Sequence, residues 1–118
     1  MFKIIVAGGR HFNDWDLCST KLDRILKDQK SIEIVSGGAK GADELGELYA
    51  KTRNYKLKVF PADWDKFGKS AGYRRNKEMA EYADALVAFW DGNSVGTKMM
   101  IELAKKNNIG VRVITYTP

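Results

Sequence analysis

Ser36-Gly37-Gly38-Ala39-Lys40-Gly41-Ala42-Asp43 marks the point where a strand pattern gives way to a helix pattern. The β-branched run 32–35 comes before it, and the apolar residues after it fall at Ala42, Leu45 and Tyr49, which is helical spacing. Three glycines within five residues let the backbone turn sharply and leave the amides uncovered. The sequence therefore predicts a strand, a tight turn and a helix whose first N–H groups point at one spot.

A phosphate group suits that spot, because it attracts uncovered amides and positive charge. Lys40 adds a charge and Ser36 a hydroxyl, while Asp43 in the first helical turn either accepts ribose hydroxyls or compensates the helix dipole. The alternative is a turn that needs glycine for packing alone. The ligand contacts predicted here are Ser36, Gly37, Gly38, Lys40, Gly41 and Asp43.

Strand and helix patterns alternate along the whole chain. Strands are expected at 2–7, 32–35, 56–60, 85–89 and 111–115, with helices at about 15–28, 42–53 and 73–82 and another after Thr97. This order predicts an α/β fold, a Rossmann-like three-layer α/β/α arrangement in one domain, 1–118. The five-stranded parallel sheet is expected in the order 3-2-1-4-5, since 56–60 alternates like an edge strand and 85–89 is uniformly apolar.

Ligands of such sheets bind at the carboxyl ends of the strands, beside the point where the strand order reverses. The first strand ends in Gly8-Gly9-Arg10, and the fourth leads into a second glycine-rich turn, 91–97. His11, the only histidine, follows Arg10; a catalytic role is possible there, but an ordinary loop histidine is the favoured interpretation. The contacts predicted from these two ends are Gly8, Gly9, Arg10, Asp91, Gly92, Ser94, Gly96 and Thr97, with Asp91 as a second acceptor for ribose hydroxyls.

The segment Pro61–Asn76 is predicted to be a lid over the ligand, because loops this long are usually functional and its aromatic content argues against disorder. Trp64 is expected to stack on a base, with Phe67 beside it at the mouth of the pocket. Arg75 and Asn76 would then reach the phosphate or the ribose.

The basic residues of this segment support the same interpretation. Arg74 and Arg75 are expected at a helix start, where they oppose the helix dipole unless an anion offsets them, and Lys69 lies nearby. The alternative is that one arginine is solvated and the other pairs with Asp63 or Asp65.

Composition limits the possible partners. The net charge is +5 and the pI is about 9.3, but no basic block stands out, so nucleic acid is a possible partner that the pattern does not favour. Cys18 is the only cysteine, and no zinc pattern, metal site or cofactor is predicted. No membrane span or signal peptide is visible, which predicts a cytoplasmic protein. The sequence leaves the oligomeric state open, a homo-oligomer included.

Several nucleotide-binding and hydrolytic classes are excluded by their motifs. The first strand lacks G-x-G-x-x-G, and the second ends in Ser36 where a dinucleotide-binding fold has an acidic ribose ligand. The chain also lacks the P-loop of nucleotide triphosphatases and the G-x-S-x-G of esterases.

Several short motifs, each weak alone, form a specific combination: Gly8-Gly9-Arg10, the run 36–43, Pro61-Ala62-Asp63-Trp64, Gly68-Lys69, Ala71-Gly72, Arg75-Asn76, Met79, Asp91-Gly92 and Gly96-Thr97. Taken together, they resemble the YspA branch of the SLOG superfamily, small proteins of bacteria and phages. The resemblance covers nearly the whole chain and implies a Rossmann-like fold with a nucleotide-related ligand. The superfamily also includes the LOG-type phosphoribohydrolases and Smf/DprA.

One departure bears on activity. In the LOG enzymes the last glycine turn is followed within three residues by catalytic glutamates, whereas Lys98-Met99-Met100 stands here and Glu102 is the first acid. No phosphoribohydrolase activity is therefore expected, and no catalytic residue is assigned. The leading hypothesis is a nucleotide sensor or sequestering module. The alternatives are an N-glycosidic hydrolase or transferase using Glu102, Asp43 or Asp91, and single-stranded DNA binding of the Smf/DprA type.

Overall fold

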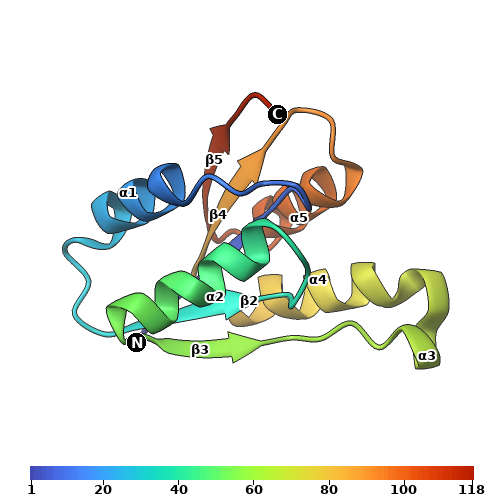
Figure 1. The fold of residues 1–118 in the computed structure, drawn as a ribbon. Helices are drawn as coiled ribbons and strands as arrows, with labels where there is room; N and C mark the ends of the chain where they lie inside the picture. Colours follow the sequence, from blue (N-terminus) through green and yellow to red (C-terminus); the bar gives the residue numbers. More distant parts are fainter.

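The computed structural model describes residues 1–118 and contains one parallel sheet in the order β3-β2-β1-β4-β5 (Figure 1). The predicted Rossmann-like fold and strand order are thereby confirmed. The strands are β1 (Phe2–Gly8), β2 (Ile32–Ser36), β3 (Lys56–Val59), β4 (Ala85–Trp90) and β5 (Gly110–Thr115). The helices are α1 (Trp15–Leu26), α2 (Ala42–Arg53), α3 (Trp64–Phe67), α4 (Ala71–Tyr82) and α5 (Val95–Lys106), with a short 3₁₀ helix at Gly68–Ser70.

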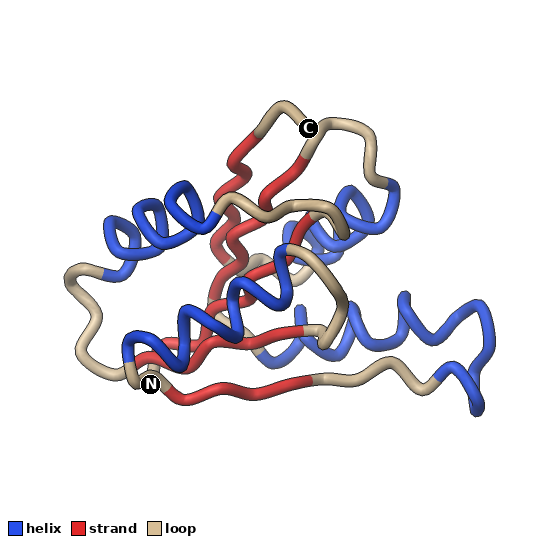
Figure 2. The backbone as a smooth tube through the Cα atoms, in the orientation of Figure 1, coloured by secondary structure: helices blue, strands red, loops and turns tan.

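The helices cover both faces of the sheet, so the core lies in two layers (Figure 2). On one face α1 and α2 pack against alternate residues of the central strands, such as Ile4 and Val6 of β1. On the other face α4 and α5 pack against the intervening residues, such as Ile5 of β1. Because β1 is covered on both sides, Ile4, Ile5 and Val6 have no exposed surface.

Local signals explain where several elements begin and end. The Asp14 side chain accepts a hydrogen bond from the Leu17 N–H at 3.0 Å and so caps α1. Asn54 ends α2 in the left-handed conformation. The helix α1 ends at Leu26, two residues before the end that the sequence predicted.

The start of α4 differs from the prediction in a way that matters for the site. The 3₁₀ helix at Gly68–Ser70 runs directly into α4, which begins at Ala71 instead of Tyr73. Arg74 and Arg75 therefore occupy the second turn, where the helix dipole acts on them less strongly. The segment predicted as a long irregular loop is in fact largely helical from Trp64 onward.

The strand order reverses between β1 and β4, and this switch point gathers the predicted turns. The chain builds β1, β2 and β3 outward in one direction and then returns to place β4 and β5 on the other side of β1. The ends of β1, β2 and β4 all meet at one edge of the sheet, which confirms that the glycine-rich turns share it. None of the helices combines the length and apolarity needed to cross a bilayer.

Candidate functional site

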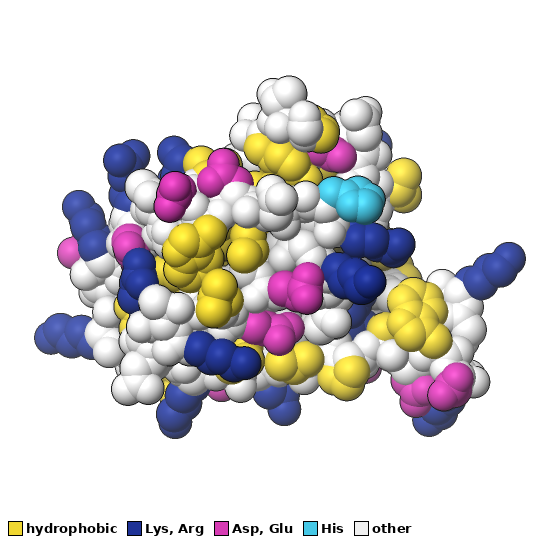
Figure 3. All heavy atoms as spheres, viewed as in Figure 1, with side chains coloured by type: hydrophobic (Ala, Val, Ile, Leu, Met, Phe, Trp, Pro, Cys, Tyr) yellow, Lys and Arg dark blue, Asp and Glu magenta, His cyan; other side chains and the backbone are white.

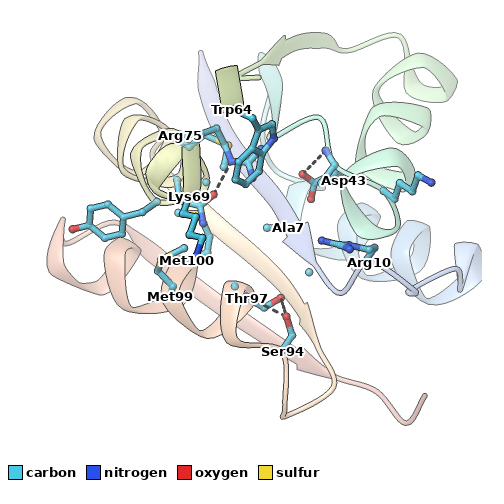
Figure 4. A pocket seen from close by; sticks show the side chains of 18 residues that line it. Ala7, Arg10, Asp43, Trp64, Lys69, Arg75, Ser94, Thr97, Met99 and Met100 are labelled. Atoms are coloured by element: carbon cyan, nitrogen blue, oxygen red, sulfur yellow. Dashed lines mark hydrogen bonds between the residues drawn. The ribbon is translucent and has the colours of Figure 1, made fainter. Parts of the chain in front are cut away.

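A cavity of about 440 Å³ opens at this edge, within the size range of small-molecule sites (Figure 4). It is bounded by the end of β1, the turn before α2, the segment carrying Trp64 and α4, and the beginning of α5. Of the predicted contacts, those that line it are Gly8, Arg10, Lys40, Asp43, Trp64, Arg75, Asn76, Ser94, Gly96 and Thr97.

The other predicted contacts lie elsewhere. Gly9 and Asp91 line a neighbouring cavity of about 410 Å³. Ser36, Gly37, Gly38, Gly41 and Gly92 line neither cavity. Ser36 is fully buried, and its hydroxyl donates to Glu47 at 2.7 Å, so the predicted ligand contact of this hydroxyl is not supported.

The turn between β2 and α2 uses most of its own amides. The Gly38 N–H donates to the Ser36 hydroxyl at 3.0 Å, the Ala39 N–H to Asp43 at 3.2 Å and the Gly41 N–H to Glu44 at 3.0 Å. Between residues 38 and 41 the Lys40 N–H alone has no acceptor within the chain. The expectation of a row of uncovered amides is corrected here, because side chains of the same turn already satisfy them.

Glycine is required in this turn for close packing. Gly41 has a φ of +79°, and a Cβ there would lie 2.3 Å from the Gly9 carbonyl oxygen and 2.4 Å from that of Arg10. Gly37 leaves room where Arg75 and Asp43 approach, since a Cβ would lie 2.8 Å from the Arg75 Nη1 and 2.9 Å from the Asp43 Oδ2. The packing interpretation of these glycines is therefore supported for this turn.

Asp43 is the acidic residue in the wall of the larger cavity. Its side chain is 7% exposed, and burial raises the pKa of Asp43 to about 6, although the Ala39 N–H and the Arg75 guanidinium favour the charged form. The carboxyl therefore titrates about one unit below neutral pH. Asp43 therefore holds the turn and also lines the cavity.

Arg75 connects the predicted lid to the turn before α2. Its guanidinium donates to the Gly37 carbonyl oxygen and, through Nε at 2.9 Å, to the Asn76 side chain (Figure 4). Asn76 is itself 8% exposed. Arg75 thus contributes charge to the cavity while its direct partners are a carbonyl and an amide, both neutral.

The remaining lid residues divide between the cavity and the outside. Trp64 lines the cavity and is 58% exposed, whereas Phe67 lies outside it, beneath the Arg74 guanidinium at 4.3 Å from the ring centroid. Arg74 also donates to the Ser70 hydroxyl at 3.1 Å. Neither arginine pairs with Asp63 or Asp65, because the one ion pair of the chain joins Arg53 to Asp23. The expected place of Phe67 at the mouth was wrong.

Positive charge is concentrated around the larger cavity. Arg10, Lys40, Lys69 and Arg75 line it, and none of them is in an ion pair. Figure 3 shows basic side chains gathered beside the single histidine, between it and the hydrophobic side chains at the right of the view. Four cations against one acid with a raised pKa make this space attractive to an anion.

The turn between β4 and α5 is built differently. Ser94 caps α5 by accepting from the Thr97 N–H at 3.3 Å, and Asp91 accepts from the Ser94 N–H at 2.8 Å. The N–H of Gly96 has no acceptor in the chain, and no atom lies within 4 Å of the position of a Cβ there. Trp90 does not line either cavity; its ring N–H donates to the Ser94 carbonyl at 3.1 Å and steadies the turn.

Some residues that line the cavity carry no recognisable signal in the sequence. Met99 and Met100 face it from α5, but methionines at helical spacing predict core packing. Tyr73 lines it although no motif marked it, and Lys69 was expected near an anion without being named as a contact. The wall residues that were not predicted are Ala7, Ala39, Lys69, Gly72, Tyr73, Met79, Met99 and Met100.

Metal and thiol chemistry find no support in the arrangement of side chains. No three His, Cys, Asp or Glu side chains are grouped so that they could hold a metal ion. Cys18 is buried in α1, and burial raises the pKa of Cys18 to about 12, so it behaves as a small apolar residue.

Comparison with known proteins identifies the family of this chain and a solved structure with a similar fold. The sequence profile of the YspA, cpYpsA-related SLOG family matches residues 2–67. The Gene 61 protein of Mycobacterium phage D29 is 36% identical over 126 residues, which cover 98% of this chain and 97% of that protein. The X-ray structure of DNA processing protein A (DprA) from Streptococcus pneumoniae superposes with a TM-score of 0.77 at 18% identity. That match covers 99% of this chain and 51% of DprA, so the chain spans about half the length of that protein.

Proposed function

We propose that this chain, which belongs to the YspA, cpYpsA-related SLOG family, binds a nucleotide or nucleotide-derived ligand in the larger cavity and acts as a sensor or sequestering module. One observation carries the proposal: four cations outside any ion pair surround a cavity that also has an exposed tryptophan in its wall. Cations suit the phosphates and Trp64 suits the base.

The phosphate is expected between the start of α5 and the opposite wall. The Gly96 N–H and the Lys40 N–H both lack acceptors, and each residue lines the cavity. A helix N-terminus with an open amide favours an anion. We therefore expect the phosphate to lie against the amides of Lys40 and Gly96.

The segment Pro61–Asn76 is proposed as the lid of this site. Trp64 would lie against the base, while Arg75 and Asn76 reach the phosphate or ribose. The helical turns of Gly68–Ser70 and α4 hold Lys69 and Arg75 on the same wall as Trp64 (Figure 4). Base and phosphate would therefore be recognised by one segment of chain.

A thermal-shift panel tests this proposal. Nucleoside monophosphates and diphosphates are compared with single-stranded oligonucleotides at two salt concentrations. Stabilisation by mononucleotides supports the proposal, because a ligand that binds only the folded state raises its stability. Oligonucleotide binding with a steep salt dependence, and none by mononucleotides, would replace it with single-stranded DNA binding.

A matched pair of lysine variants localises the site. Lys69→Ala removes a cation from the cavity wall, and Lys66→Ala removes an exposed lysine three positions earlier that does not line it. Lys69→Ala is expected to weaken nucleotide binding about ten-fold, since hydrogen bonds to charged groups contribute about 1.5–3 kcal/mol. Equal affinities for the two variants would place the ligand elsewhere.

Cleavage of a nucleotide N-glycosidic bond is the second candidate, and one observation favours it: Asp43, in the cavity wall, has a pKa raised to about 6, as a general acid needs. Glu102 is exposed and lines neither cavity. Met99 and Met100 lie in the cavity wall, and they occupy the chain positions where the related hydrolases have catalytic glutamates. Base release from nucleoside monophosphates is therefore expected to be absent, and release abolished by Asp43→Asn would establish the second candidate.

A further inference from the structure

The second cavity adjoins the first. Its volume is about 410 Å³, and it lies between the end of β1 and the residues that follow β4 and β5, with Gly9, His11, Asp91 and Tyr116 in its wall. Arg10 and Ser94 line both cavities. In Figure 4 these two residues lie across the larger cavity from Trp64. A ligand that starts at Trp64 and passes Arg10 would therefore enter the second space.

Asp91 offers a fixed, charged acceptor in the second cavity. Its Oδ1 accepts from the N–H groups of Asn93 and Ser94, both at 2.8 Å, and no hydrogen bond of the chain uses its Oδ2. These two backbone bonds lower the pKa of Asp91. The carboxylate is consequently ionised and held in place with one oxygen available. Such an oxygen accepts from hydroxyl groups and repels phosphate.

Tyr116 adds another polar side chain to the wall of this cavity. The Tyr116 hydroxyl sits over Gly9, because a Cβ at residue 9 would lie 2.3 Å from that oxygen. The Tyr116 ring packs against Phe12 at a centroid distance of 4.7 Å, and Phe12 stacks on Phe89 at 4.6 Å. The hydroxyl makes no hydrogen bond within the chain. A hydroxyl-bearing group in this cavity would find both a carboxylate and a phenol in its wall.

We infer that the second cavity holds a sugar joined to the nucleotide through a diphosphate, an inference that rests on the proposed function. Arg10 lies where the two spaces meet and suits the linking phosphates. Asp91 suits the sugar hydroxyls and disfavours a further phosphate. The ligand class is therefore a nucleoside diphosphate whose terminal phosphate carries a pentose or hexose.

Two matched pairs of compounds test this inference: ADP with ADP-ribose, and UDP with UDP-glucose, each titrated by calorimetry. The sugar-bearing member of at least one pair is expected to bind about ten-fold tighter than its partner. Equal affinity within both pairs would overturn the inference and leave the proposed function standing. Failure of all four compounds, together with mononucleotides, would remove the proposed function and this inference with it.

Asp91→Asn locates the effect in the second cavity. Asparagine retains an oxygen for the Asn93 and Ser94 amides, so the turn is kept while the charge is lost. The preference for the sugar-bearing compound should fall about ten-fold, because hydrogen bonds to a charged acceptor are stronger, while ADP and UDP bind as before. Asp16→Asn, an equal charge change on exposed α1, is the control. A preference that survives Asp91→Asn would contradict the inference.

Discussion

The two glycine-rich turns lie at the same edge of the sheet, yet they differ in what their glycines do. In the turn before α2 the N–H groups of Gly38 and Gly41 donate to side chains of the same chain. Gly41 also packs against the backbone of residues 9 and 10, which follow β1. In the turn before α5 the Gly96 amide has no acceptor and open space surrounds it. One turn is packed against its neighbours, and the other is accessible from the cavity.

The difference shows that a glycine-rich pattern predicts a tight turn but does not predict whether the N–H groups of that turn are free to bind a ligand. Ser36, Asp43 and Glu44 stand within reach of the first turn and satisfy its donors. The second turn places its acceptors, Asp91 and Ser94, so that Gly96 is left uncovered. Substitutions in the first turn should therefore affect folding, and those in the second should affect binding.

The largest effect is expected from Gly41→Ala. A left-handed φ and contacts of 2.3 and 2.4 Å to backbone oxygens combine strain with overlap, so the free energy of unfolding should fall by about 3 kcal/mol or more. Urea denaturation measures the loss. Gly96→Ala, with open space around its Cβ, is the control and should leave the midpoint unchanged or slightly higher. If Gly41→Ala unfolds at the same urea concentration as the parent, the turn before α2 is not more tightly packed than the turn before α5.

Opposite pH dependence of the two carboxylates is the second prediction. The pKa of Asp43 is raised from 3.8 to about 6, so the native state binds its proton more tightly than the unfolded chain does. The free energy of unfolding should therefore fall as pH rises from about 4 to 6, by at most about 3 kcal/mol from this group. Asp43→Asn should remove that fall.

The pKa of Asp91 is lowered, so its contribution has the opposite sign. It stabilises the fold above the unfolded-state pKa, and that stabilisation is lost as pH falls through the folded-state pKa. Urea midpoints between pH 3 and 7 for Asp43→Asn and Asp91→Asn check both directions. Variants that change the pH profile in the same sense would contradict the assignment.

Gly96→Leu should separate binding from folding. The new side chain meets no atom at its Cβ and projects from a residue that lines the cavity, so it should occupy ligand space while the helix is retained. Nucleotide affinity should fall about a hundred-fold with an unchanged thermal midpoint. Val95→Leu, one residue earlier and outside both cavities, is the matched control. Unaltered nucleotide affinity in Gly96→Leu would show that the ligand does not bind at the turn before α5.

The smallest of the four effects is expected from Trp64→Ala. Stacking on a base contributes roughly 1–3 kcal/mol, so nucleotide affinity should fall about ten-fold to a hundred-fold. Trp64 is 58% exposed, and the fold should tolerate its removal. Leu48→Ala, a truncation of another exposed apolar residue outside the cavities, controls for surface effects. If calorimetry gives the same affinity for both variants, the segment Pro61–Asn76 is not a lid.

Much of the fold could be predicted because the deciding signals are local. The uniform apolar run 85–89 predicted a central strand, and the alternation in 56–60 predicted an edge strand; β4 and β3 occupy those places. The glycine-rich turns followed from the same patterns, and so did their common edge. The start of α4 was misplaced because Gly68 and Gly72 indicated a loop. Gly72 in fact lies inside α4, and Gly68, with a φ of +55°, ends α3 and begins the 3₁₀ helix that leads into α4.

The sequence by itself determined the order of strands and helices, the position of the turns and the family resemblance, since these depend on residues a few positions apart. Tertiary structure alone decided which groups remain available to a ligand. Arg75 reaches the Gly37 carbonyl across 38 residues of sequence, and Asp43 acquires its raised pKa from burial. Such contacts and desolvation arise when distant segments pack together, and no local pattern encodes them.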